Sequence, residues 1–169
     1  MDIPLCPMEH KPQILLTDPA ALPLCRQQPE RFAGAIAPDG ETCAVWAQSL
    51  APMPVGLMLD CPPVPDAEEC GRPVTMVYMK QCKQAFRPLL HDDAAFYCLR
   101  GAQTFAALRA AVLALGDLCG RTVIAELLVD DDEGRLSDGT DIRAAVGVLQ
   151  RIGVTTVILT AHDPQSITE

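Results

Sequence analysis

Aromatic side chains and positive charge are scarce in this chain. Phe, Trp and Tyr make up 4 % of the residues, and 13 Lys and Arg stand against 22 Asp and Glu, a formal charge of −9. Single strands of nucleic acid are bound largely by aromatic stacking, and duplexes are bound by basic patches. No basic cluster interrupts the acidic sequence, so we expect no nucleic-acid partner.

Long apolar runs are also missing. The longest run, 105–115, is interrupted by Arg109, whereas a membrane span needs about 20 apolar residues. The first residues, MDIPLCPMEHKPQ, lack both the basic start and the apolar stretch of a secretory signal. We therefore expect no membrane partner and a cytoplasmic protein. In that reducing compartment the eight cysteines are expected to be free thiols packed as small apolar side chains.

The short motifs that bind metals and phosphates are absent as well. The cysteines form no C-x-x-C pair, and no pair of histidines has the spacing of a zinc finger. The acidic run 130–133 does not fit a calcium loop, because Val129 stands at the first ligand position, so we predict a solvated turn. No P-loop or dinucleotide-binding glycine motif is present. From these absences we predict neither a metal nor a cofactor.

Seven short apolar runs, by contrast, recur along the chain. They span 13–17, 32–36, 55–59, 74–79, 94–99, 122–129 and 154–160, and each has about the length of a buried strand. Several are continuous rather than alternating, which is typical of a parallel sheet covered on both faces. A chain of 169 residues has the size of one domain. We predict a single α/β domain over 1–169, with a mainly parallel sheet.

Helices are predicted between the strand runs. Residues 104–118 are rich in Ala and Leu, and residues 141–152 place their apolar side chains on one face; a glycine follows each segment. Shorter helices are predicted at 41–50 and over part of 79–90, where Pro88 interrupts the pattern. This strand–helix–strand order predicts right-handed crossovers between parallel strands.

The number of strands and the length of the chain indicate an incomplete barrel. After the last strand run, Asp163 and Pro164 are typical of a helix start, as N-cap and first helical residue. Seven strands in 169 residues fall short of the roughly 250 residues of a closed (β/α)8 barrel. We expect an incomplete or degenerate TIM-barrel-like fold.

Three segments, taken in order, resemble the homocysteine S-methyltransferases. Residues 14–23 (ILLTDPAALP) resemble the opening strand and Asp-Gly-x-Met-Gly-Thr turn of that family, and residues 32–41 (FAGAIAPDGE) resemble its Ala-Gly-Ser-Ile-Gly-Pro-x-Gly-Glu segment. Residues 120–161 resemble its later strand, acidic glycine turn, Ser/Thr-Gly-Thr, helix, Leu-Gly-Val and strand. The resemblance implies a TIM barrel that binds homocysteine in methionine biosynthesis.

The same resemblance implies a zinc centre that these residues do not build. The family holds zinc with cysteine thiolates, one in an Asn-Cys pair and two adjacent, and the zinc lowers the thiol pKa of homocysteine for attack on the methyl donor. Here Thr160 and Ala161 stand at the Asn-Cys position, and the adjacent pair is absent. One hypothesis is a degenerate, non-catalytic binding or interaction module. The other is part of an active methyltransferase whose metal site is completed by a partner or a further C-terminal half.

Four residues at or near strand ends are candidates for contacting a small-molecule ligand: Asp18, Cys98, Glu126 and His162. For Asp18 the resemblance implies a contact to the ligand's amino group, and the alternative is a turn or helix cap. Cys98 is either a reactive thiol or a packed one. Glu126 lies within an apolar strand, so it faces the barrel mouth or a poorly covered face. His162 follows the last strand, where it either contacts a ligand or is a capping or surface residue.

The open edges of an incomplete barrel also bear on partners. Unpaired strand edges tend to pair with another chain, and most assemblies of identical chains are symmetric dimers. We therefore expect a homodimer, or a corrinoid- or folate-binding domain as the partner that the resemblance implies.

Overall fold

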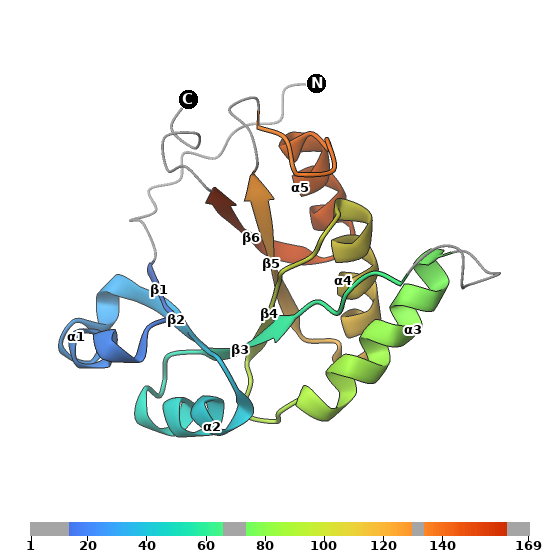
Figure 1. Ribbon diagram of the computed structural model, residues 1–169. Helices are drawn as coiled ribbons and strands as arrows, with labels where there is room; N and C mark the ends of the chain where they lie inside the picture. Colours follow the sequence, from blue (N-terminus) through green and yellow to red (C-terminus); the bar gives the residue numbers. More distant parts are fainter. Residues whose placement is uncertain (1–13, 66–73, 130–133, 162–169) are drawn as a thin grey trace.

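The sheet consists of six parallel strands that neighbour one another in chain order. The computed structural model describes residues 14–65, 74–129 and 134–161. Within them the strands are β1 (Ile14–Leu16), β2 (Phe32–Ala37), β3 (Val55–Asp60), β4 (Phe96–Arg100), β5 (Thr122–Val129) and β6 (Val154–Ala161) (Figure 1). Every pairing between neighbours is parallel. The predicted α/β fold with a parallel, incomplete TIM-barrel-like sheet is thereby confirmed.

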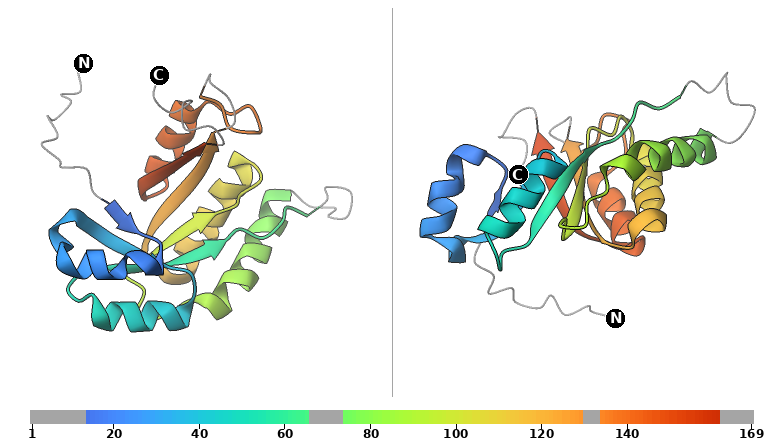
Figure 2. Two further views of the ribbon diagram at one scale, coloured as in Figure 1. Left: turned by 60° about the vertical axis from the view of Figure 1, so that its left-hand side comes forward. Right: turned by 90° about the horizontal axis from the view of Figure 1, so that it is seen from below.

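Helices connect the strands and cover the outside of the curved sheet, as the two views of Figure 2 show for α2 to α5. The helices are α1 (Leu22–Gln27), α2 (Gly40–Ser49), α3 (Val74–Phe86), α4 (Phe105–Cys119) and α5 (Ile142–Arg151), with short 3-10 turns η1 (Pro19–Ala21), η2 (Pro29–Arg31) and η4 (Arg87–Leu89). No helix in these described residues is long and apolar enough to cross a membrane.

Capping residues mark the ends of helix α4 and the start of helix α5. The Thr104 hydroxyl accepts a hydrogen bond from the Ala107 amide (3.1 Å) at the start of α4, and Gly120 takes the left-handed conformation (φ 59°) at its end. Asp141 caps α5 in the same way, accepting from the amides of Arg143 and Ala144. The helices predicted at 104–118 and 141–152 are confirmed.

The predicted strand at 74–79 is wrong, because this segment begins helix α3. Tyr78, Cys82 and Phe86 follow one another at a spacing of four residues, and all three are buried on the face of α3 that packs into the core. That spacing matches the 3.6-residue helical period, and the burial of the three side chains stabilises the helix over an extended strand. The sheet in the described residues therefore has six strands rather than seven.

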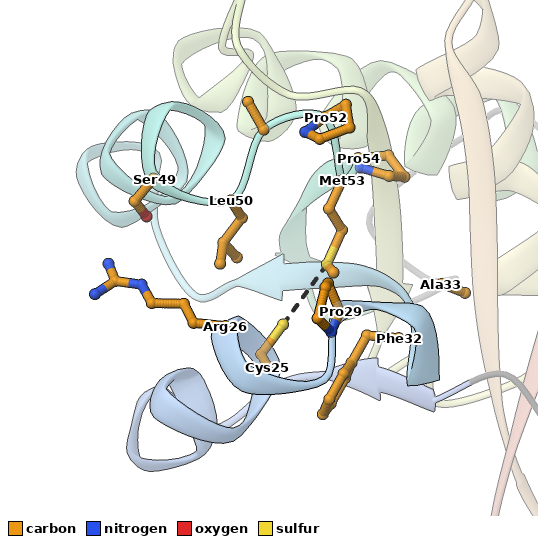
Figure 3. A pocket seen from close by; sticks show the side chains of 11 residues that line it. Cys25, Arg26, Pro29, Phe32, Ala33, Ser49, Leu50, Pro52, Met53 and Pro54 are labelled. Carbon is orange, nitrogen blue, oxygen red and sulfur yellow. Dashed lines mark hydrogen bonds between the residues drawn. The ribbon is translucent and has the colours of Figure 1, made fainter.

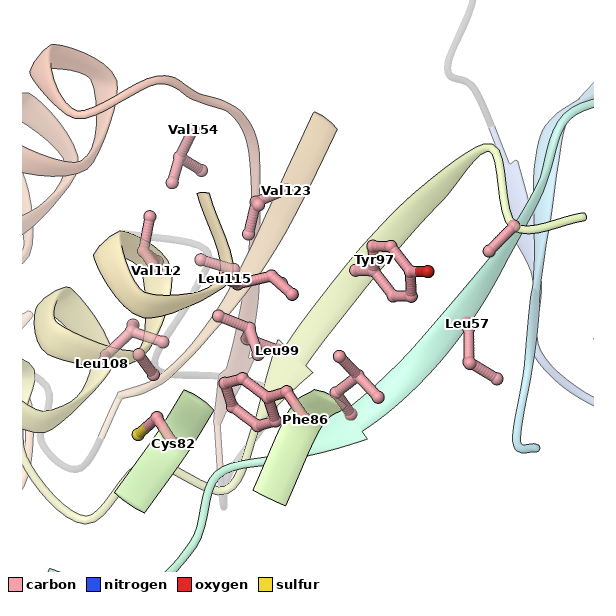
Figure 4. Close-up of a cluster of buried hydrophobic side chains, with 14 of the residues drawn as sticks. Leu57, Cys82, Phe86, Tyr97, Leu99, Leu108, Val112, Leu115, Val123 and Val154 are labelled. Carbon is pink, nitrogen blue, oxygen red and sulfur yellow. The ribbon is translucent and has the colours of Figure 1, made fainter. Parts of the chain in front are cut away.

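The main core lies between the outer face of the sheet and the helices. Alternate residues of the central strands, such as Leu57, Tyr97, Leu99 and Val123, belong to this core, and Figure 4 shows Leu99 and Val123 beside the side chains of α3 and α4. The cysteines behave as expected in the part of the chain that is described: Cys25, Cys43, Cys82 and Cys98 are buried free thiols, and Cys61 and Cys119 are half-buried ones.

A second, smaller apolar cluster lines the concave face of the sheet, which carries no helix of the described residues. It consists of Ile36, Phe96, Cys98 and Ile124, with Leu15, Met58 and Ile158 packed against it. Gly56 is required here, since a Cβ added to it would lie 2.2 Å from the Phe96 ring. The ring therefore fills the space above β3, and the concave face has an apolar floor.

Candidate functional site

Polar side chains gather at the carboxyl ends of the strands, above this apolar floor. Asp60 and Arg100 are the last residues of β3 and β4, and they are register partners in adjacent parallel strands. Arg100 donates from Nε to Asp60 Oδ1 (2.5 Å) and from Nη2 to Asp60 Oδ2 (3.3 Å). The register two residues earlier pairs Met58 with Cys98, which are floor residues, so the ion pair projects from the concave face.

Glu126 joins this group from the next strand. It lies two residues beyond the floor residue Ile124 in β5, and its carboxylate accepts a hydrogen bond from the Thr160 hydroxyl of β6 (2.8 Å). The pKa of Arg100 is raised, first by its hydrogen bond to Asp60 and also by the charges of Asp60 and Glu126. The concave face on which Glu126 lies carries no helix of the described residues, so the barrel mouth and the poorly covered face that were predicted for Glu126 are the same surface here. We call Asp60, Arg100, Glu126 and Thr160 the strand-end cluster.

Cys98 lies beneath the strand-end cluster as part of the floor. Its side chain is 1 % exposed. The pKa of its thiol is raised to about 12, mainly by burial and also by the charge of Glu126, while the charge of Arg100 opposes both effects. A thiol with that pKa is protonated at neutral pH, so the geometry fits the packed alternative rather than the reactive one.

Asp18 lies apart from the strand-end cluster, at the end of β1. Its carboxylate is exposed and accepts a hydrogen bond from the Ala20 amide (2.9 Å), which makes it the N-cap of η1. Asp18 and Arg31 also line a separate hollow of about 270 Å³ beside β1. The structure thus gives Asp18 the capping role that was one of its two predicted roles. His162 lies outside the described residues.

Sequence reasoning missed Asp60 and Arg100, which carry the most exposed polar contact of the cluster. Each stands one residue beyond a predicted strand run, 55–59 and 94–99. The sequence signal that could have found this pair is an acidic residue and a basic residue that each directly follow a predicted strand. The predicted residues Cys98 and Glu126 are brought together with them.

The cluster offers charges and hydrogen-bond acceptors but no activated nucleophile. In the described ranges, no group of three or more His, Cys, Asp or Glu side chains lies close enough to hold a metal ion. The zinc–thiolate centre that the family resemblance implies needs several cysteine thiolates. Among the described residues of the concave floor Cys98 is the one cysteine, so these residues do not fit such a centre. Arg100 can bind an anionic group, and the two carboxylates can bind a cationic one.

Comparisons with known proteins support the fold of the chain but assign it to no family. No protein-family model and no curated protein sequence matches the chain. The carboxyl transferase domain of pyruvate carboxylase from Rhizobium etli is similar at 17 % identity and a TM-score of 0.51, over 89 % of this chain and 27 % of that one. The complete enzyme from the same organism is similar at 16 % identity and a TM-score of 0.51, over 89 % and 16 %.

The chain therefore spans about a quarter or less of the structures it resembles. At this identity the likeness establishes the TIM-barrel-like fold alone. It does not test the resemblance to homocysteine S-methyltransferases.

Proposed function

We propose that this protein is a non-catalytic binding module, a degenerate relative of the homocysteine S-methyltransferases, that holds a zwitterionic amino acid at the strand-end cluster. The observation that carries the proposal is the exposed Asp60–Arg100 ion pair beside the Glu126 carboxylate, above an apolar floor. Ligands of barrel folds bind at this carboxyl edge of the strands.

The charges suit a molecule with one carboxylate and one ammonium group. Arg100 can take the carboxylate in a bidentate contact, and Asp60 and Glu126 can take the ammonium. In the free chain Arg100 is held by Asp60, and the two side chains are 47 % and 68 % exposed. Exposed ion pairs contribute only about 0–1 kcal/mol, so a ligand can replace this pair at little cost.

The floor suits an apolar or thioether side chain. Ile36, Met58 and Cys98 lie on the concave face below the strand ends, and none of them carries a charge. A side chain of the homocysteine or methionine type would pack there, and Met58 offers a polarizable sulfur contact. The resemblance and the apolar floor thus support the same ligand class.

The lack of an activated thiol supports binding without methyl transfer. With a pKa of about 12, the Cys98 thiol is ionised in only about one molecule in 10⁵ at pH 7. The described residues of this face offer Cys98 as their one thiol rather than a set of thiolates for zinc, which supports binding of a homocysteine thiol without its activation by a metal.

Calorimetric titration of the intact protein with L-methionine and L-homocysteine tests the binding proposal. We expect saturable binding of both, and at least tenfold weaker binding of N-acetylmethionine and methioninol, which lack the ammonium and the carboxylate. Arg100→Gln should weaken L-methionine binding about tenfold. The control Lys83→Gln, which breaks the similarly exposed Lys83–Asp117 pair on α3 and α4, should not change it. No binding, or equal binding by Arg100→Gln, contradicts the proposal.

A separate assay tests the absence of catalysis. The protein is incubated with homocysteine and methylfolate, methylcobalamin, betaine or S-methylmethionine, and methionine is measured. We expect no methionine above the protein-free control. Methionine formation that a chelator abolishes would favour the alternative, an active methyltransferase with a metal site completed by another chain.

The free sheet edges lead us to propose in addition that the chain pairs with a second copy. Within the described residues β1 pairs only with β2, and β6 pairs only with β5. The edge strand β6 is eight residues long and contains no charged residue and no proline, the features that usually block edge pairing. An isologous contact would pair the β6 edge of one copy with the β6 edge of the other.

A further inference from the structure

A pocket of about 400 Å³ opens beside the starts of strands β2 and β3 (Figure 3). Phe32 and Ala33, at the start of β2, and Pro54, just before β3, form one side of it. Helix α1 contributes Cys25 and Arg26, the end of α2 contributes Ser49, and the connection from α2 to β3 contributes residues 50–53. The pocket and the strand-end cluster therefore lie at opposite ends of the strands.

The walls of the pocket are mainly apolar and are held together across the fold. Leu50 and Met53 face Cys25, Pro29 and Phe32 across the opening (Figure 3). The Cys25 thiol contacts the Met53 thioether at 3.8 Å, so α1 is joined to the α2–β3 connection. A volume of this size lies within the range of small-molecule sites, and its apolar walls suit a hydrocarbon body.

Charge at the pocket is one-sided. Arg26 is the only charged side chain among the described residues that line it, although the whole chain has 22 acidic residues. Within the described part of the chain, the Arg26 guanidinium has neither a hydrogen bond nor an ion pair, whereas the side chains of Arg100 and Lys83 each have a carboxylate partner. An unpaired guanidinium at the rim of an apolar pocket is complementary to a carboxylate attached to an apolar body.

We infer that this pocket is a second binding site, for a small amphipathic monocarboxylate whose apolar body lies against Leu50, Met53 and Phe32 and whose carboxylate pairs with Arg26. The site goes beyond the proposed amino-acid binding, since it shares no residue with the strand-end cluster. A bound ligand contacts both α1 and the α2–β3 connection, so it stabilises the native state over the unfolded one.

The probes are the carboxylates hexanoate and 3-phenylpropionate. Hexanol and hexylamine are the controls for hexanoate, and 3-phenylpropanol is the control for 3-phenylpropionate, because each keeps the apolar body and changes the head group. Protein labelled with ¹³C at its methionine methyl groups reports the position, because Met53 lines this pocket and Met58 lies on the concave floor. We expect both carboxylates to shift the Met53 methyl resonance saturably and to leave that of Met58 unchanged. Hexanol and 3-phenylpropanol should bind at least fivefold more weakly, and hexylamine should not bind.

Two variants locate the charge. Arg26→Gln should weaken hexanoate binding at least fivefold, and the control Arg31→Gln, on the neighbouring η2 and outside this pocket, should leave it unchanged. The folded state of both is checked by thermal unfolding. The inference is overturned if neither carboxylate shifts Met53 at tens of millimolar, if the alcohols bind as tightly as the acids, or if Arg26→Gln binds as the wild type does. L-methionine should shift Met58 and not Met53, so failure of one site is distinguishable from failure of the other.

Discussion

Replacing Gly56 by alanine tests how tightly the concave floor is packed. The new Cβ would lie 2.2–2.6 Å from three atoms of the Phe96 ring, whereas ordinary van der Waals contact begins at 3.4 Å. Phe96 is only 8 % exposed, so its ring cannot turn away without disturbing Ile36 and Ile124. Overpacking of this kind costs about 1–3 kcal/mol. With a urea m-value of about 2 kcal/mol/M, a loss of 2 kcal/mol lowers the midpoint by about 1 M.

Equilibrium urea unfolding, followed by circular dichroism, measures the effect. The matched control is Gly147→Ala in α5, where nothing lies within 4 Å of the added Cβ; it should stabilise the protein by about 0.5–1 kcal/mol. In a Phe96→Leu background, Gly56→Ala should cost less than half as much, because the smaller side chain leaves room. An unchanged midpoint for Gly56→Ala, or the same cost in both backgrounds, would refute the packing described for this face.

Two further predictions concern pH and association. Because the folded-state pKa of Cys98 is raised from 9.0 to about 12, the folded chain keeps a proton that the unfolded chain loses, so stability is full below pH 9 and falls as the pH rises toward 12. Cys98→Ala should make the free energy of unfolding fall less steeply with pH, by up to about 1.4 kcal/mol per pH unit. Urea unfolding from pH 8 to 10.5 measures this slope, and an equal slope in variant and wild type would count against the raised pKa. Sedimentation equilibrium at tens of micromolar should give a dimer formed through the β6 edges, and a monomer would argue against that pairing.

Local signals predicted most of the fold. The ends of α4 and α5 follow from Thr104, Gly120 and Asp141, whose capping does not depend on distant parts of the chain. The runs at 122–129 and 154–160 match β5 and β6 within one residue. The run at 74–79 failed because its valine, threonine and tyrosine favour a strand, while the helical spacing that decides it extends beyond the run to Phe86.

The candidate site was less predictable because it depends on register. Glu126 was found from its own surroundings, since a carboxylate in an apolar strand requires an explanation. Asp60 and Arg100 are 40 positions apart, and only the alignment of β3 with β4 places them together. The pocket beside Arg26 likewise requires α1 and the α2–β3 connection to meet, which only the packed fold defines.

The most direct test of the central claim is the ¹³C-methyl spectrum of Met58 during titration with unlabelled L-methionine. Met58 lies on the concave floor and is two residues from Asp60, so a zwitterion held by Arg100 and the neighbouring carboxylates would place its side chain beside this methyl group. The account predicts a saturable shift of the Met58 resonance, assigned with Met58→Leu, that is abolished in Arg100→Gln. A Met58 resonance that does not move with L-methionine, or that moves equally in Arg100→Gln, would contradict it.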